Sequence, residues 1–343
     1  TDLAGEPTVQ AKLMSVIGRV YTSTGNYPQA DSLLQTALTL RQRQGDVSSL
    51  DQAWTKQTLA YSHFRQGRYA EAERLYRDVL DSYRHSDPGL SRRAAVLNGL
   101  ALVLDESGAP AQADSIYREI IELYQAKRDS VPGTYYHNLA IALEHQNQFE
   151  AALPKHEKAL SAFRRQYSTF HPTVANALAR MAFTYQRAGR IATADSLHRE
   201  ALVMRRNLLP PNHPHLASSL VRFGWLLVQR GQVTEARAKA KEGLSILQSI
   251  LPEGHWQIAA ARSVLALCDL ADGRFEAAEE PLRTQFEMGR TQFGAHDWRT
   301  RAAARALVKL YRTWKKPTQA KRYAQWLAKT RTGESETRLP TPG

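Results

Sequence analysis

A six-residue pattern recurs along this chain at a nearly constant interval. It consists of a small or polar residue, an aromatic or apolar residue two positions later, and an alanine three positions after that. Clear copies run over 25–30 (GNYPQA), 67–72 (GRYAEA) and 273–278 (GRFEAA), and further copies begin at 108, 147, 189, 231 and 315. Successive copies begin 39 to 42 residues apart. Eight copies at this spacing predict an array of equivalent structural units.

Each unit is predicted to be a pair of helices. Apolar side chains three and four positions apart precede the pattern and would form one stripe on a helix. In the first and fifth copies these residues are Met14, Ile17, Gly18 and Tyr21, and Leu178, Met181, Ala182 and Tyr185. The glycine would end the first helix in the left-handed conformation. The alanine would lie in the second helix where the two helices cross, a position at which a larger side chain would overpack.

Turn-forming residues punctuate the chain between these pairs. Pro172 and Pro214 each follow a histidine and are placed to be first residues of a helix, where the missing N–H does no harm. We find no strand pattern. The sequence therefore predicts an all-α fold of about sixteen helices. Its repeats would span 8–46, 47–87, 88–130, 131–170, 171–212, 213–254, 255–296 and 297–331, giving an array over 1–331 and a flexible tail over 332–343.

Composition narrows the function classes. The single cysteine, Cys268, lies in an apolar run and is predicted to be buried, and one cysteine excludes an internal disulfide. The longest apolar run, 223–228, is far too short to span a membrane. The chain begins at Thr1, with neither a methionine nor a signal pattern, so we expect a segment of a longer protein. We expect a cytoplasmic location.

Patterns typical of catalysis are missing from the sequence. There is no glycine-rich phosphate loop, nucleophile elbow or zinc-protease motif. His213 and His215 flank Pro214, and we interpret them as a helix cap in preference to metal ligands. His137, Glu144 and His145 share a predicted face but lack a fourth ligand. We therefore predict no enzymatic activity, cofactor, metal or small-molecule substrate.

The repeat pattern resembles the tetratricopeptide repeat. Its period of about 42 residues, with His171-Pro172 and His213-Pro214 before successive repeats, is similar to the kinesin-light-chain-like subtype. The segment 5–21 (GEPTVQAKLMSVIGRVY) also resembles repeat regions of some bacterial serine/threonine protein kinases. The resemblance implies a right-handed α-solenoid that binds a partner protein or peptide in its concave groove. The alternative is a sensor or regulatory module of a larger signalling protein.

The resemblance places groove residues on the first helix of each pair. The candidates are Arg19, Trp54, Gln57, Tyr61, Phe64, Arg65, Asn98, His137, Asn138, Phe183, Arg187, Arg222 and Trp225. Aromatic and arginine side chains are the commonest anchors of interfaces, but the aromatic candidates could equally pack between repeats.

Family members use an asparagine to bind the backbone of a peptide, and Asn138 occupies that position here. Asn98 lies one position away from it, and Arg180 and Arg222 replace it in the fifth and sixth repeats. The sequence therefore lacks a regular asparagine ladder. The arginines would suit an acidic ligand.

Positive charge is concentrated near the end of the chain. The net charge is +13, and residues 299–338 contain twelve basic and two acidic residues. Candidate members of a basic patch are Arg305, Lys309, Arg312, Lys315 and Lys316. Three interpretations are open: a solvated capping repeat, a site for an acidic protein partner, or a nucleic-acid site in which the interleaved aromatic residues stack on bases.

Overall fold

The computed structural model describes residues 6–45, 50–84 and 87–330. Within these ranges the chain forms sixteen α-helices and no strand, as predicted. The chain divides into two compact units, residues 1–166 and 167–343, which we describe separately. The expected tail, 332–343, and Arg331 and Arg338 of the basic segment lie outside the described residues.

Unit 1 contains eight of the helices. They are α1 (Pro7–Thr24), α2 (Tyr27–Arg43), α3 (Leu50–Arg65), α4 (Tyr69–Ser82), α5 (Leu90–Glu106), α6 (Pro110–Ala126), α7 (Gly133–His145) and α8 (Phe149–Gln166). Unit 2 contains the other eight. They are α9 (Pro172–Arg187), α10 (Ile191–Leu208), α11 (Pro214–Gln229), α12 (Val233–Ile250), α13 (Trp256–Ala271), α14 (Phe275–Phe293), α15 (Trp298–Thr313) and α16 (Pro317–Lys329). No helix in the described ranges has the length and apolar character to cross a membrane.

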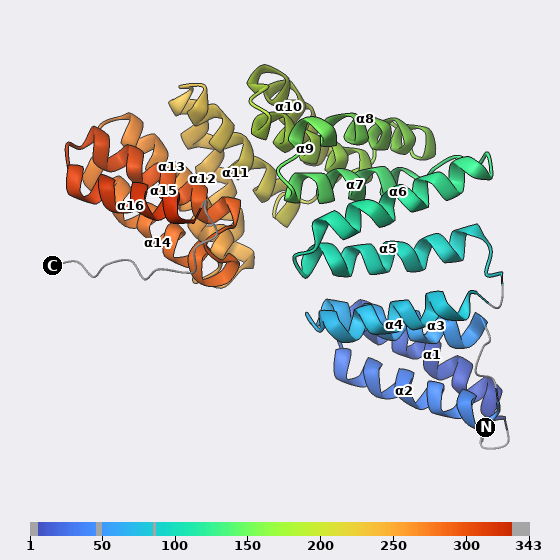
Figure 1. Ribbon diagram of the computed structural model, residues 1–343. Helices are drawn as coiled ribbons and strands as arrows, with labels where there is room; N and C mark the ends of the chain where they lie inside the picture. Colours follow the sequence, from blue (N-terminus) through green and yellow to red (C-terminus); the bar gives the residue numbers. More distant parts are fainter. Residues whose placement is uncertain (1–5, 46–49, 85–86, 331–343) are drawn as a thin grey trace. The chain divides into compact units, whose positions relative to one another are not determined.

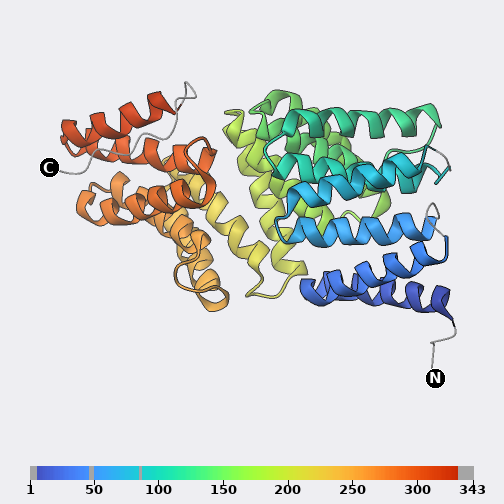
Figure 2. The ribbon, with the colours of Figure 1, turned by 60° about the horizontal axis from the view of Figure 1, so that its bottom comes forward.

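Within each unit, helices that follow one another in sequence pack side by side as hairpins (Figure 1; Figure 2). Each second helix also packs on the first helix of the next pair. The first helices contact one another in turn, α1 with α3, α3 with α5 and α5 with α7, and likewise α9 with α11, α11 with α13 and α13 with α15. Within each unit the first helices therefore form a layer, and their outward residues can act together as one surface of that unit.

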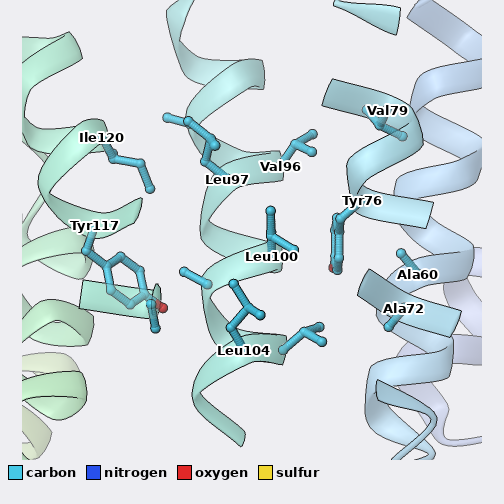
Figure 3. Close-up of a cluster of buried hydrophobic side chains, with 14 of the residues drawn as sticks. Ala60, Ala72, Tyr76, Val79, Val96, Leu97, Leu100, Leu104, Tyr117 and Ile120 are labelled. Atoms are coloured by element: carbon cyan, nitrogen blue, oxygen red, sulfur yellow. The ribbon is translucent and has the colours of Figure 1, made fainter. Parts of the chain in front are cut away.

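The repeated alanine marks the closest approach within each hairpin, as predicted. Seven of the eight copies are completely buried and the eighth, Ala320, is 5% exposed. Apolar side chains fill the space between successive pairs. Figure 3 shows this core in unit 1, where Tyr76 of α4 and Tyr117 of α6 lie on opposite sides of the leucines of α5. Packing of this density leaves little room for larger side chains at the crossing points.

The first helix of each pair ends at a residue with positive φ. In six repeats this residue is the predicted glycine, for example Gly25 with φ 82°. Asn147 and Lys315 adopt the same conformation with φ 60° and 57°. The turn geometry is therefore kept in the two copies that lack glycine, although a lysine enters the left-handed region only at an energetic cost.

The predicted apolar stripe is correct in the fifth repeat and only partly correct in the first. Leu178, Met181, Ala182 and Tyr185 are all buried. In α1, by contrast, Ile17 is 45% exposed, and the buried face consists of Ala11, Ser15, Gly18 and Thr22. The two hydroxyl groups tolerate burial because Ser15 donates to the carbonyl of Ala11 and Thr22 donates to that of Gly18. Gly18 of the predicted stripe is thus buried, but hydrophobicity alone placed Ile17 on the wrong side of this helix.

Candidate functional site

Unit 1 contains a groove of about 510 Å³ along its first helices. Six residues expected from the sequence line it: Arg19, Trp54, Gln57, Tyr61, Phe64 and Asn98. Tyr135 at the start of α7 also lines it, although the sequence did not single it out. The groove thus combines aromatic rings with amide and guanidinium groups contributed by α1, α3, α5 and α7.

The aromatic side chains of this groove are arranged with cations beside them. The guanidinium carbon of Arg19 lies 5.3 Å from the centroid of the Trp54 ring. The rings of Tyr61 and Phe64 lie 6.2 Å apart. Arg65 donates to the Tyr61 hydroxyl over 3.2 Å, and this hydrogen bond raises the pKa of Arg65. Tyr61 is 40% exposed, so its ring remains accessible to a ligand.

The two asparagines expected to contact a peptide contact each other. The Asn138 amide nitrogen donates to the Asn98 side-chain oxygen over 2.8 Å. This bond links α7 to α5 and occupies one donor of Asn138. A ligand would meet an amide pair at this point of unit 1, instead of two separate amides.

His137 points toward its own second helix. Its ring lies 5.6 Å from that of His156 and 6.2 Å from that of Phe163, both in α8. Glu144 accepts a hydrogen bond from buried His156 over 2.7 Å, and His145 pairs instead with Asp105 of α5. The three residues with a shared predicted face are therefore directed to different partners. We leave His137 out of the proposed binding surface.

Unit 2 contains an apolar cavity of about 170 Å³ among its first helices. Phe183 of α9 and Arg222 and Trp225 of α11, all expected from the sequence, line this cavity together with Trp256 of α13 and Trp298 of α15. Three of its four large aromatic rings are tryptophans, whereas the groove of unit 1 has one tryptophan, Trp54. Such a concave, largely apolar site with few polar groups is the usual form of a ligand pocket.

Trp298 brings the aromatic side chains of unit 2 together. Its ring centroid lies 5.1 Å from that of Phe183 and 6.3 Å from that of Trp225. The guanidinium carbon of Arg187 lies 5.1 Å from the Trp298 ring, and that of Arg222 lies 5.0 Å from Phe183. Phe183 is only 4% exposed, so it forms the floor of the cavity and packs between helices at the same time.

Several polar residues of the cavity were not predicted as site residues, among them Gln285 and Arg299. Gln285 of α14 lines it, and its side-chain oxygen has no hydrogen-bond partner within the described residues. This glutamine occupies the position, seven residues after the repeated alanine, at which other repeats carry small or apolar residues. Arg299 also lines the cavity and pairs with Asp297 over 2.9 Å. This departure from the repeat pattern is the sequence feature that could have identified Gln285 as a site residue.

The expected basic patch lies on the helices next to this cavity. Arg305, Lys309 and Arg312 are exposed along one face of α15, and none of them forms an ion pair within the described residues. Lys315 is also exposed, whereas the Lys316 ammonium lies 3.1 Å from the centroid of Trp314. Because Ala302 and Ala306 of α15 line the cavity, the three unpaired cations run beside it.

The other candidate chemical groups have structural roles. The His213 ring nitrogen accepts a hydrogen bond from the backbone N–H of His215 over 3.1 Å, which confirms it as a cap of α11. Cys268 is fully buried, as predicted, and burial raises the pKa of its thiol. In the part of the chain that the structure describes, no group of three or more histidine, cysteine or acidic side chains is placed to hold a metal ion.

Comparison with known proteins agrees with this architecture. The tetratricopeptide repeat description matches residues 9–85, 131–207 and 173–249, more than half of the chain. No curated protein sequence matches. Among solved structures, the apo form of RapI superposes with a TM-score of 0.70 at 12% identity, covering 94% of this chain and 87% of that chain. NprR in complex with its cognate peptide NprX gives 0.60 at 13% identity, covering 92% and 87%.

A repeat protein described as a kinesin light chain from Podosopora anserina is similar over a shorter segment. Its TM-score is 0.50 at 22% identity, with 60% of this chain and 99% of that chain covered. At these identities the solved structures support the fold alone. The family match, the eight helical hairpins and the buried alanine of every hairpin together lead to one conclusion: the chain belongs to the tetratricopeptide repeat family.

Proposed function

We propose that this chain is a protein-interaction scaffold whose first helices bind a peptide or protein segment carrying acidic groups. The observation that carries the proposal is the cavity of unit 2, where Phe183, Trp225, Trp256 and Trp298 surround a space of about 170 Å³. A cavity of about 150 Å³ can hold a benzene ring. The space therefore suits one apolar side chain of a bound segment, and aromatic and arginine residues are the usual interface anchors.

The acidic character of the ligand follows from the cations around this cavity. Arg222 and Arg299 line it, and Arg305, Lys309 and Arg312 extend along α15 beside it. Carboxylates would form charge-assisted hydrogen bonds with these guanidinium groups. The groove of unit 1, with Arg19, Trp54 and Tyr61, would provide a second contact surface. NprR, which has a similar fold, was solved with a bound peptide, and this supports the peptide-binding mode.

We also propose that this scaffold is cytoplasmic and that it works without a cofactor and without catalytic activity. It is tested by affinity capture on immobilised chain, with the Phe183→Ala/Trp225→Ala variant compared to wild type. A matched control, Phe170→Ala/Val203→Ala, removes two exposed apolar side chains of the same unit that are 47% and 59% exposed and lie away from the cavity. We expect proteins recovered by wild type and control to be depleted by at least about tenfold with the cavity variant, since interface anchors are worth 2 kcal/mol or more.

Equal recovery of every protein by the two variants would refute the role of the cavity. A parallel arm uses mixed-sequence DNA and RNA at low salt, because the cations of α15 also suit phosphate groups. Tight nucleic-acid binding that is lost in Arg305→Ala/Lys309→Ala/Arg312→Ala would replace the acidic protein with a nucleic acid as the ligand.

A further inference from the structure

The cavity of unit 2 extends from the first helices to the second helices. Its lining on α13 and α15 includes small side chains, namely Ala260, Ser263, Ala302 and Ala306. Leu247 of α12 and Leu282 and Gln285 of α14 also line it, and both helices are second helices of their pairs. The small residues leave a space of about 170 Å³ that the surrounding aromatic rings do not fill. This space can therefore enclose a small ligand and not only contact its surface.

Gln285 places an unpaired polar group in this lining. The equivalent residues of other repeats are apolar or small, for example Ile120 and Ala201, which are 0% and 1% exposed. The side-chain oxygen of Gln285 is buried and has no hydrogen-bond partner within the described residues. A buried polar atom without a partner destabilises a fold. Packing alone therefore favours an apolar residue at this position, and the glutamine indicates a group that pairs with it in the cavity.

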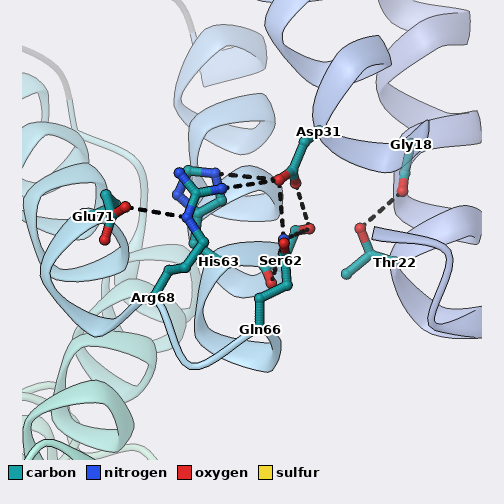
Figure 4. A network of polar contacts seen from close by, with 8 residues as sticks. All are labelled: Gly18, Thr22, Asp31, Ser62, His63, Gln66, Arg68 and Glu71. Carbon is teal, nitrogen blue, oxygen red and sulfur yellow. Dashed lines mark hydrogen bonds and ion pairs between the residues drawn. The ribbon is translucent and has the colours of Figure 1, made fainter. Parts of the chain in front are cut away.

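Glutamine amides elsewhere in the chain have partners on neighbouring helices. Gln66 donates to Asp31 of α2 over 3.0 Å, within the polar network that joins the first two repeats (Figure 4). In unit 2, Gln186 donates to Gln229 over 3.1 Å, between the ends of α9 and α11. The oxygen of Gln285 has no such neighbour in the described part of the chain, so a ligand is the source of its hydrogen-bond partner.

Arginine side chains restrict the charge of this ligand. Three aromatic rings of the cavity each have a guanidinium carbon nearby: Arg187 at 5.1 Å from Trp298, Arg222 at 5.0 Å from Phe183 and Arg299 at 5.6 Å from Trp256. The faces of aromatic rings attract cations, and these arginines already provide that interaction. A further positive charge would be repelled by them. The ligand is therefore an uncharged or anionic molecule.

Trp298 favours a free small molecule over a longer segment as the enclosed ligand. Its ring lies 5.1 Å from that of Phe183, so it joins the fifth repeat to the eighth across the first helices between them. A bound protein segment can insert at most one side chain beside this contact, as proposed above. A small molecule needs only the cavity itself, and a space of about 150 Å³ already holds one benzene ring.

We propose that the cavity of unit 2 binds a free small molecule of the phenol class. Its single aromatic ring lies among Phe183, Trp225, Trp256 and Trp298, and its hydroxyl group pairs with Gln285. A hydroxyl fits this amide because it can donate to the oxygen or accept from the nitrogen, whichever is turned toward the cavity. The regulatory consequence rests on the proposed function: the phenol occupies the space of the anchoring side chain and so excludes the bound segment.

The test compares 4-methylphenol with p-xylene, which has the same shape but a methyl group in place of the hydroxyl. Isothermal titration calorimetry on the full chain gives both dissociation constants, for wild type and for Gln285→Leu. We expect the ratio of the p-xylene constant to the 4-methylphenol constant to be at least about fivefold larger in wild type, because the variant loses the hydrogen bond. Leucine is the residue of the eighth repeat at this position, Leu327, and circular dichroism checks the fold.

Three controls make the result specific. Gln325→Leu, the same change at an exposed position of α16 outside the cavity, should keep the wild-type ratio. Ala302→Phe should abolish binding of both compounds because the added ring fills the cavity, and Ser263→Phe serves the same purpose if that variant does not fold. Benzylamine, which has a similar size but is protonated, should bind wild type at least about tenfold more weakly than 4-methylphenol.

The outcomes separate this inference from the proposed function. No saturable binding of 4-methylphenol to wild type, or the same ratio in wild type and Gln285→Leu, would overturn the phenol site, whereas the affinity capture described above would still decide the scaffold role. Binding of 4-methylphenol together with equal capture by all variants would leave the phenol site and remove the scaffold role of the cavity. Captured proteins that depend on the cavity should be released by 4-methylphenol, and their retention would refute the exclusion.

Discussion

At the scale of single residues, close packing between neighbouring helices sets which side chains are tolerated. Gly99 lies in the middle of α5, and a Cβ placed on it would lie 2.4 Å from the ring of Tyr76. Tyr76 is only 3% exposed and is enclosed by the core shown in Figure 3. The glycine is needed for this approach of two helices, and its φ lies in the ordinary range of a helix.

Gly99→Ala is therefore expected to destabilise unit 1 by about 1–3 kcal/mol, the usual cost of overpacking a core. Urea denaturation of the full chain measures the free energy of unfolding. Gly254→Ala is the matched control, because a Cβ there meets nothing within 4 Å and no positive φ is required. Equal stability of the two variants would show that Tyr76 moves aside without cost.

A buried histidine makes the stability of unit 2 dependent on pH. Burial lowers the pKa of His198 to about 3, with a further contribution from Arg222. Its ring stacks on Phe223 at 5.7 Å, and its Nε2 atom has no hydrogen-bond partner within the described residues. Between pH 6.5 and 3 the unfolded chain therefore binds a proton that the folded chain does not, and stability must fall as the pH falls through this range.

We expect His198→Leu to remove part of this pH dependence. The histidine contributes a slope of up to about 1.4 kcal/mol per pH unit below pH 6.5, and leucine has no proton to bind. Thermal unfolding at pH 7.5, 6 and 5 should show a smaller decrease of Tm in the variant than in wild type. His296→Leu, at an exposed position, serves as the control. Identical pH profiles of wild type and His198→Leu would contradict the expectation.

At the scale of helices, the residues at the helix ends are as informative about the repeat as the residues on the helix faces. Three first helices of unit 2 begin after a histidine whose ring nitrogen accepts a backbone hydrogen bond, namely His171, His213 and His255. Asp297 performs the same function before α15. At their other ends, first helices stop at a left-handed residue even where the glycine has been replaced. The same backbone conformation therefore recurs at this turn in every hairpin, although the residue that adopts it differs.

Lys315→Gly is expected to stabilise the last hairpin by about 0.5–1 kcal/mol. Lysine at φ 57° is strained, and the gain from relieving this strain exceeds the entropy that glycine loses on folding. Chemical denaturation of the variant and of Lys316→Gly provides the measurement. Lys316 has a φ of −106° and contacts Trp314, so glycine there should lower stability. A destabilised Lys315→Gly would refute the strain argument.

At the scale of the whole molecule, charge and apolar surface are distributed unevenly along the array. The cations of α15 accompany the aromatic cavity of unit 2, whereas the exposed apolar residues of α1 belong to unit 1. Each unit therefore presents a different chemistry to a partner. A chain with net charge +13 should attract acidic ligands over a distance of about 10 Å at 0.1 M salt.

Binding of an acidic probe should accordingly depend on salt and on α15. With polyglutamate as the probe, we expect affinity to fall steeply between 50 and about 300 mM salt, since screening shortens the range of the attraction. Arg305→Ala/Lys309→Ala/Arg312→Ala should weaken binding at low salt and flatten the salt dependence. Arg77→Ala, which removes an arginine paired with Glu73 in unit 1, is the control. A triple variant that retains the wild-type salt dependence would contradict the proposed role of these cations.

The sequence by itself determined the repeat period, the helical hairpins and the alanines at their crossings. These features follow from local rules, because helix spacing and turn conformation are written in residues close together in the chain. It also identified six of the residues that line the groove of unit 1 and three of those that line the cavity of unit 2. It could not say which candidates meet, so that His137 was assigned to a groove although its ring packs on α8.

Only the tertiary structure decided contacts between repeats. Phe183 and Trp298 come from the fifth and eighth repeats, and their approach depends on how successive hairpins are stacked within unit 2. The exposure of one side of α1 could likewise not be predicted from the sequence. Its apolar residues have the same spacing as a core stripe, and only their burial in the structure distinguishes an exposed stripe from a buried one. Local sequence fixes each hairpin, whereas the angle between hairpins is the sum of many side-chain contacts that no single repeat contains.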